Sequence, residues 1–317
     1  MIKVFKTVES VCEIISGYDM SEDMPENGSW LNVIDPTSEE IEKLSQKLNI
    51  PPGFLADPLD INERPRIEVG KKNTLILIRI PYFDDSNNSI QFTTIPLGIV
   101  LTEGLVITVC SKDSEVIQAF IDDRVKDWST AKRSRFGLQI FFRTALLYLD
   151  YLDRINMDTA AVEEKLQKSM KNEGLVELLN FDKSLVYFAA SLRANEIMME
   201  KLQETEMLKI CPDDRGLLED AITENRQAIE MVDIYSNVLS GITDTFASII
   251  SNNLNMVMKF LTSVTIILML PTLLASIYGM NIKLPLQNWP HAFALTMGIS
   301  VILSIVGIIV FVWRRWF

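Results

Sequence analysis

The residues of this chain that can do chemistry are amide, hydroxyl and thioether side chains placed along one apolar segment. From Asn255, alternating steps of three and four residues reach a series of such side chains, namely Met258, Thr262, Thr265, Met269, Thr272 and Ser276. These steps stay on one face of a helix, here called the polar stripe. Such a stripe must be hidden from lipid, either along water or against other helices. Helix packing is the alternative to a water-filled path, because Ser and Thr are common where membrane helices meet.

Two apolar segments near the C-terminus must position this stripe. The first begins at Met256 and is longer than the roughly 20 residues that span a ~30 Å hydrocarbon core as a helix. It ends in Tyr278-Gly279-Met280-Asn281, and a short loop at 282–291 leads to a second apolar run at 292–313. The second run is almost wholly apolar and therefore suits the lipid side. The sequence predicts two transmembrane helices over 256–317.

A long helix is predicted upstream of these two helices. Pro212 and Asp213 are typical of a helix start, and the next proline is Pro271. One helix of that length extends about 100 Å, which indicates a stalk. Continued backwards, the stripe reaches mostly small, polar or acidic residues, including Asp244 and Asp220. Such a face fits a water-filled funnel between several copies, and the alternative is the solvent face of a surface helix.

The first 130 residues read as an α/β domain. Thr37 and Glu40 form a capping signal for a helix that runs to about Leu48. Runs rich in β-branched residues and bounded by Asn, Asp, Pro and Gly predict strands at 2–8, 30–34, 74–80, 90–95 and 98–109.

The middle of the chain has helical periodicity. Apolar residues recur at threes and fours over 134–208, with a break at 172–174, which predicts two antiparallel helices. The predicted divisions are an α/β domain at 1–130, a helical hairpin and stalk at 131–255, and two transmembrane helices at 256–317. The predicted fold class is therefore an α+β membrane protein.

Composition argues against several classes of function. The chain has 317 residues and a net charge of −12, so nucleic acid is not an expected partner. Its three cysteines, Cys12, Cys110 and Cys211, are scattered and predict neither a disulfide framework nor a CxxC metal site. The single histidine, His291, argues against a histidine cluster, and no nucleophile–base pair is evident, so an enzyme is not expected. The first residues lack the pattern of a signal peptide.

The triplet Gly279-Met280-Asn281, the hairpin that follows it and the long charged helix before it together resemble the CorA family of divalent-cation channels. The resemblance covers essentially the whole chain and is tightest from Asp244 to Asn281. It implies a homopentameric funnel and a passive Mg²⁺ channel, with Mg²⁺ as the transported ion and as a regulatory ligand. It implies no organic cofactor.

The first transmembrane helix then lines the pore. Gly279, Met280 and Asn281 form the selectivity element, since amide oxygens can accept hydrogen bonds from hydrated Mg²⁺ without trapping the ion. Met258 and Leu261 form apolar girdles that gate by dewetting, as similar residues do in the family. The remaining pore-lining residues are Asn255, Thr265, Met269 and Thr272.

Charge predicts the topology. Arg314 and Arg315 follow the second helix and Lys259 begins the first, whereas the loop has only Lys283. The positive-inside rule therefore places both termini in the cytoplasm, with the chain crossing the cell's inner (plasma) membrane. Trp289, Trp313 and Trp316 lie where interfacial aromatic residues belong.

The chain departs from the family at two places. Relatives commonly have acidic residues in the outer loop, but 282–291 has no acid. Relatives also sense cytoplasmic Mg²⁺ through carboxylates between subunits; Asp220 and Asp244 match the stalk positions, but the expected partner region has Lys71 and Lys72. The alternatives are therefore the same fold carrying Zn²⁺, Co²⁺ or Ni²⁺, and a membrane-tethered scaffold that conducts nothing.

Overall fold

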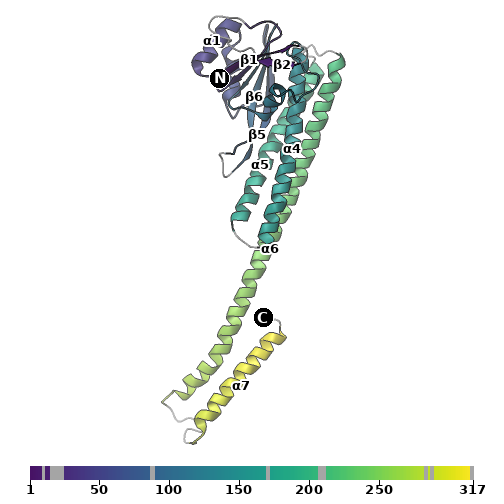
Figure 1. Cartoon of the computed structure of the whole chain (residues 1–317). Helices are drawn as coiled ribbons and strands as arrows, with labels where there is room; N and C mark the ends of the chain where they lie inside the picture. The colour runs from purple at the N-terminus through teal and green to yellow at the C-terminus, as the bar shows by residue number, and fades with distance from the viewer. Residues whose placement is uncertain are drawn as a thin grey trace. The chain divides into compact units, whose positions relative to one another are not determined.

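The structure is a computed structural model that describes residues 1–8, 11–14, 25–85, 90–168, 172–205, 212–281, 285 and 289–314. The chain forms two compact units, Met1–Gly241 and Ile242–Phe317. One helix, α6 (Pro212–Tyr278), passes from the first unit into the second (Figure 1). The predicted continuity of the stalk with the first apolar segment is confirmed. Lys283, Arg315, Trp316 and Cys211 lie outside the described residues.

A seven-stranded sheet forms the centre of the first unit, with strand order β2-β1-β3-β7-β6-β5-β4. Only the pairing of β3 with β7 is parallel among the described strands; the other pairs are antiparallel. The strands are β1 (Ile2–Val8), β2 (Val11–Ile14), β3 (Trp30–Ile34), β4 (Arg66–Val69), β5 (Thr74–Phe83), β6 (Phe92–Leu101) and β7 (Val106–Cys110).

The strands predicted at 2–8 and 30–34 are confirmed, but the break predicted between 95 and 98 is wrong. Strand β6 continues through Pro96, which lies opposite Arg79. The chain instead turns at Thr102, whose hydroxyl oxygen accepts hydrogen bonds from the backbone N–H groups of Gly104 (3.3 Å) and Leu105 (2.9 Å). The sequence did not indicate β2 or β4.

Both faces of the sheet are covered. One face packs against α1 (Ser38–Leu48) and α2 (Pro52–Ala56) in a core that includes Leu31, Val33, Leu44 and Phe54. On the other face Trp30 lies against Trp128 and Phe136, with ring centroids 5.9 and 5.1 Å apart. The predicted cap of α1 is confirmed, because the Thr37 side chain accepts from Glu40 N and the Glu40 side chain accepts from Thr37 N. The short helices α2, η1 (Asp57–Leu59) and α3 (Glu115–Ile121) were not predicted.

Three long helices complete the first unit. Helices α4 (Arg133–Lys168) and α5 (Asn172–Thr205) form the predicted hairpin, but residues 172–174 belong to α5 and the connection lies before them. Arg135 on α4 forms an ion pair with Asp214 on α6 (2.9 Å), and Arg193 on α5 forms one with Asp233 on α6 (3.0 Å).

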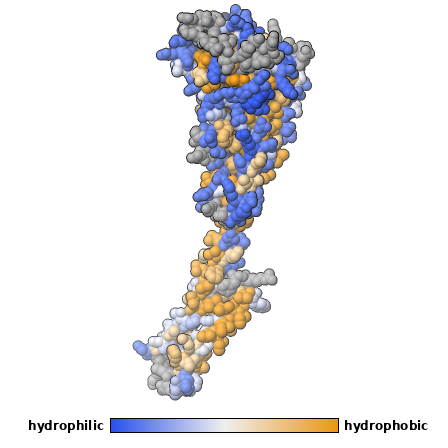
Figure 2. All heavy atoms as spheres, in the orientation of Figure 1, coloured by the Kyte–Doolittle hydropathy of each residue, from blue (hydrophilic) through white to orange (hydrophobic). Residues whose placement is uncertain are grey.

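The second unit contains the end of α6 and helix α7 (Ala292–Trp313). The bounds of α7 are those predicted from the sequence. The helices Asp214–Tyr278 and Ala292–Trp313 are long and apolar enough to cross a membrane. Figure 2 shows apolar residues over much of the surface of this part of the chain.

Candidate functional site

The polar stripe lies on one side of α6, and the contact with α7 lies on the other. The side chains of Ile267 and Leu270 are the nearest to Gly307 of α7, each 3.6 Å from the position a Cβ would take there. Thr265 and Thr272 are exposed and stand two residues from Ile267 and Leu270, respectively. Two residues correspond to about 200° around a helix. The second unit therefore packs the Ile267 and Leu270 side of α6 against α7 and leaves the polar stripe exposed.

Every pore-lining residue predicted on α6 is exposed. This holds for Asn255, Met258, Leu261, Thr265, Met269 and Thr272, and also for Thr262 and Ser276. Met258 is 52% exposed and Leu261 is 57% exposed. The surface of unit Ile242–Phe317 thus offers an amide, several hydroxyls and three apolar side chains along one helix face.

The hydroxyl groups of this face donate to their own helix. Thr265 Oγ1 donates to Leu261 O (2.8 Å), and Thr272 Oγ1 donates to Leu268 O (2.9 Å). The hydroxyl proton is then used within the helix, and the oxygen lone pairs face outwards. An outward acceptor can receive a hydrogen bond from the water shell of a cation.

The triplet Gly279-Met280-Asn281 directly follows the last residue of α6. Gly279 N donates to Ala275 O (2.9 Å), and Met280 N donates to Ile277 O (3.3 Å). A Cβ on Gly279 would lie 3.2 Å from Ala275 O, which is closer than most Cβ contacts. Glycine therefore lets the helix end close tightly here, without a left-handed φ. Asn281 is exposed.

The sequence reading of α7 missed one face of the helix. Ser300 is buried, and Thr296, Ser304 and Gly307 are half-buried, at steps of three and four residues. Ser300 Oγ donates to Thr296 O (2.9 Å), and Ser304 Oγ donates to Ser300 O (3.0 Å). Small residues at this spacing let two membrane helices approach closely. The spacing was visible in the sequence, but the surrounding Ile, Val and Leu residues obscured it.

Asp220 and Asp244 are both exposed on α6, one in each compact unit. Neither carboxylate has an ion-pair partner in the described chain, in contrast to Asp233, which pairs with Arg193. Lys72 is paired weakly with Glu103, at 3.8 Å. Within the described residues no group of three or more Asp, Glu, His or Cys side chains could hold a metal ion. A single chain therefore has no complete metal site there.

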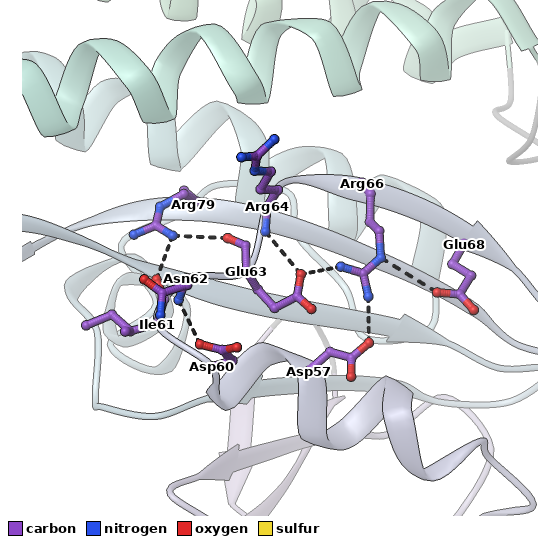
Figure 3. Close-up of polar contacts among 9 residues, drawn as sticks. All are labelled: Asp57, Asp60, Ile61, Asn62, Glu63, Arg64, Arg66, Glu68 and Arg79. Atoms are coloured by element: carbon purple, nitrogen blue, oxygen red, sulfur yellow. Dashed lines mark hydrogen bonds and ion pairs between the residues drawn. The ribbon is translucent and has the colours of Figure 1, made fainter.

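A charged network lies at the segment 57–68, where the sequence showed only two arginines around a proline. Arg66 donates to Asp57 and Glu63 (2.5 Å each) and lies 3.7 Å from Glu68 (Figure 3). Burial lowers the pKa of Arg66, but the neighbouring carboxylates, Glu63 above all, raise it by more, so the balance is upward. The Arg64 side chain points away from this network.

Arg79 is the second centre of this network. Its guanidinium donates to backbone oxygens of Ile61 (2.8 Å), Glu63 (3.0 Å) and Thr94 (2.9 Å). Burial lowers the pKa of this guanidinium. The hydrogen bonds from Arg79 to the carbonyl groups of Ile61 and Glu63 hold the segment 61–63 against the sheet.

Comparison with known proteins gives consistent matches along the chain. Residues 26–315 match the model of a family described as CorA-like Mg²⁺ transporter protein. The cobalt/magnesium transport protein CorA of Methanocaldococcus jannaschii is 31% identical over 296 residues, which cover 90% of this chain and 90% of that protein. The magnesium transport protein CorA of Helicobacter pylori is 22% identical over 313 residues, covering 95% and 93%.

Solved structures agree with these matches. The complete CorA magnesium transporter of Methanocaldococcus jannaschii superposes with a TM-score of 0.83 at 28% identity, covering 100% of this chain and 99% of that one. The full-length CmaX protein has a TM-score of 0.72 at 15% identity, covering 99% and 96%, which shows a shared fold.

Proposed function

Because the chain belongs to the CorA family of divalent-cation transporters, we propose that it assembles as a homopentamer and passively conducts hydrated Mg²⁺ into the cytoplasm. The relatives are named for transport of magnesium or of cobalt and magnesium. The family consists of transporters, not enzymes.

The open polar face of α6 is the observation that carries this proposal. The Ile267 and Leu270 side is occupied by α7, while Thr265 and Thr272 are exposed and uncovered by any described residue of the chain. Exposing amides and hydroxyls to lipid is unfavourable, and one hairpin cannot enclose them. Copies of α6 placed around an axis remove the polar face from lipid and create a water-filled path.

Selection is assigned to a ring of Asn281 side chains at the end of α6. Mg²⁺ loses its waters reluctantly, so a ring that binds the hydrated ion is suitable. Neutral amide oxygens accept hydrogen bonds from those waters, and a carboxylate ring would hold the ion more tightly. Gly279 and Met280 set the tight helix end from which Asn281 projects.

The gate is assigned to Met258 and Leu261, at the cytoplasmic end of the membrane-spanning part of α6. Both are large, apolar and exposed. Rings of such side chains exclude water when they are close together and admit it when they separate. The membrane potential supplies the driving force, about 4.6 kcal/mol per 100 mV for a divalent ion.

For Mg²⁺ to enter the cytoplasm in this way, the chain crosses the plasma membrane with both termini in the cytoplasm. Lys259 and Arg314 lie at the end of the hairpin opposite to the loop. This distribution supports a cytoplasmic location for the Met1–Gly241 unit.

Regulation by cytoplasmic Mg²⁺ is assigned to Asp220 and Asp244, provided that neighbouring copies complete the site. Like charges repeated around an axis repel, and a bound divalent ion relieves that repulsion and favours the closed arrangement. Lys71 and Lys72 do not fit a metal site, because an ammonium group repels the ion. A lysine that faces Asp220 of another copy replaces the ion as its partner.

Transport of Co²⁺, Ni²⁺ or Zn²⁺ is the second candidate, and the name of the Methanocaldococcus jannaschii relative, a cobalt/magnesium transport protein, supports the first of these ions. Purified protein in liposomes, with an ion-sensitive dye inside, separates the candidates. Entry of Mg²⁺ that rises with an inside-negative potential supports the proposal. Faster entry of a transition metal than of Mg²⁺ supports the second candidate, and no entry of any ion rejects both.

A further inference from the structure

Helix α5 exposes an apolar face, here called the α5 stripe. It consists of Val176, Leu179, Val186, Tyr187 and Ile197, which are between 46% and 67% exposed. At about 100° per residue, all five positions fall within an arc of about 100° on one side of the helix. A row of large apolar side chains in contact with water is typical of a surface that binds another protein.

A second exposed apolar surface, here called the α4–α6 patch, is formed by Met157 on α4 and Val238 on α6. They are 71% and 50% exposed. The Tyr235 hydroxyl donates to Asp153 Oδ1 (3.4 Å), which places these two helices side by side. Arg135 of α4 contacts Asp214 of α6, and further along both helices Asp153 contacts Tyr235. Residue numbers thus rise in the same direction on both helices, so α4 and α6 are parallel. Met157 follows Asp153 by four residues and Val238 follows Tyr235 by three, which is about one turn in each case.

The two surfaces lie on different sides of α6. Arg193 and Asp233 attach α5 to α6, whereas Tyr235 and Asp153 attach α4 to it. Asp233 and Tyr235 are two positions apart, which is about 200° around the helix. One copy therefore presents the α5 stripe on one flank and the α4–α6 patch on the other.

We propose that the α5 stripe of one copy packs against the α4–α6 patch of the next copy. The inference rests on the proposed homo-oligomeric function. A closed ring of more than two copies needs two different surfaces that fit each other, because each copy meets its neighbours in a head-to-tail manner. The occupant is a second copy of this chain, since each chain supplies both surfaces.

Charge complementarity supports this occupant. Lys183 lies within the α5 stripe, between Leu179 and Val186, is exposed and has no ion-pair partner in the described part of the chain. Asp150 stands seven residues before Met157, on the same face of α4. Its side chain is 60% exposed, with Arg143 only at 3.9 Å. Lys183 of one copy and Asp150 of the next thus form the matching pair.

The first test measures ring dissociation of the full-length protein in detergent by native mass spectrometry. Val186→Glu and Lys183→Glu should each raise the protein concentration at which half of the rings dissociate by about tenfold. Adding Asp150→Lys to Lys183→Glu should restore the wild-type value. Ile61→Glu is the control, because Ile61 is exposed to a similar degree (59%) but lies outside both surfaces.

The second test detects the proposed contact directly, and therefore applies even if contacts in the membrane are sufficient to hold the ring together. Two tagged chains without native cysteines, one with Val186→Cys and one with Met157→Cys, are expressed together. A disulfide between the two tags is expected, and none between two chains that both have Val186→Cys. This inference is overturned if the wild type forms rings, the substitutions leave ring dissociation unchanged and no cross-link forms. That result leaves the proposed function standing. A monomeric wild type would instead reject the proposed channel.

Discussion

The side chain of Asn195 on α5 bonds to both backbone polar groups of Arg79 on β5. Arg79 N donates to Asn195 Oδ1 (3.0 Å), and Asn195 Nδ2 donates to Arg79 O (2.7 Å). Strand β4 begins at Arg66, which lies opposite Leu77, two residues before Arg79, so no described strand covers this point of the edge. Pro96, opposite Arg79 in β6, has no N–H to offer. The amide of Asn195 thus replaces a strand and attaches the helical hairpin to the sheet.

Arg79→Met should destabilise the first unit by about 2–4 kcal/mol. The substitution leaves the backbone oxygens of Ile61, Glu63 and Thr94 without their donor, and the bonds to Glu63 and Thr94 are partly buried, where a lost partner is costly. Urea unfolding of the full-length protein in detergent measures the change. Arg64→Met is the matched control and should change stability by less than about 0.5 kcal/mol, because that side chain is exposed and outside the network. Equal effects of the two substitutions would contradict the role given to Arg79.

The buried thiol of Cys110 should lower the free energy of unfolding as the pH rises above 9. Burial raises the pKa of its thiol from 9.0 to about 11. Between these two pKa values the unfolded chain has lost the thiol proton and the folded chain has kept it. The free energy of unfolding therefore falls by on the order of 2–3 kcal/mol. Comparison of wild type with Cys110→Ala at pH 8 and pH 11 isolates this group from the other titrating residues. A stability difference between the two proteins that is the same at both pH values would be the contrary result.

Asn281→Ala should abolish Mg²⁺ uptake and leave assembly intact, because it removes an exposed amide and no core packing. Uptake into liposomes and the mass of the complex are the two measurements. Asn253→Ala serves as a control for loss of an exposed amide elsewhere on α6 and should retain uptake. Normal Mg²⁺ uptake by a correctly assembled Asn281→Ala protein would contradict the assignment of selectivity to a ring of Asn281 side chains.

Met258→Ser and Leu261→Ser should let ions leak through the closed channel, because a polar girdle stays hydrated. Closed-state conductance is the quantity to record. Met256→Ser is the matched control, since Met256 is similarly exposed (57%) but lies about 200° away from Met258. An unchanged closed-state conductance in both variants would place the gate elsewhere.

Inhibition by cytoplasmic Mg²⁺ should be weak in the wild type and stronger in Lys72→Asp. The ammonium group can stand in for the metal beside Asp220, whereas an aspartate there restores the need for a cation. Flux against internal Mg²⁺ in wild type, Lys72→Asp and Asp220→Ala measures the effect. Strong wild-type inhibition that neither substitution alters would show that these residues are not the sensor.

Local patterns in the sequence were sufficient for the long helices and for the cap of α1. The apolar run at 292–313 and the capping signal at Thr37 each depend on neighbours a few residues away, and both predictions are confirmed. Gly279, Met280 and Asn281 were found for the same reason, because helix end and motif are contiguous. The roles of these residues stay predictions.

Only the tertiary structure decided which faces are covered. Asn195 and Arg79 are 116 positions apart, and no periodicity relates them. The strand break was misplaced because Pro96 is tolerated where Arg79 bonds to Asn195, which the local sequence does not show. The small-residue face of α7 and the open α5 stripe became evident only once their neighbours were known. A sequence pattern fixes which residues share a face, but burial depends on what distant segment packs against it.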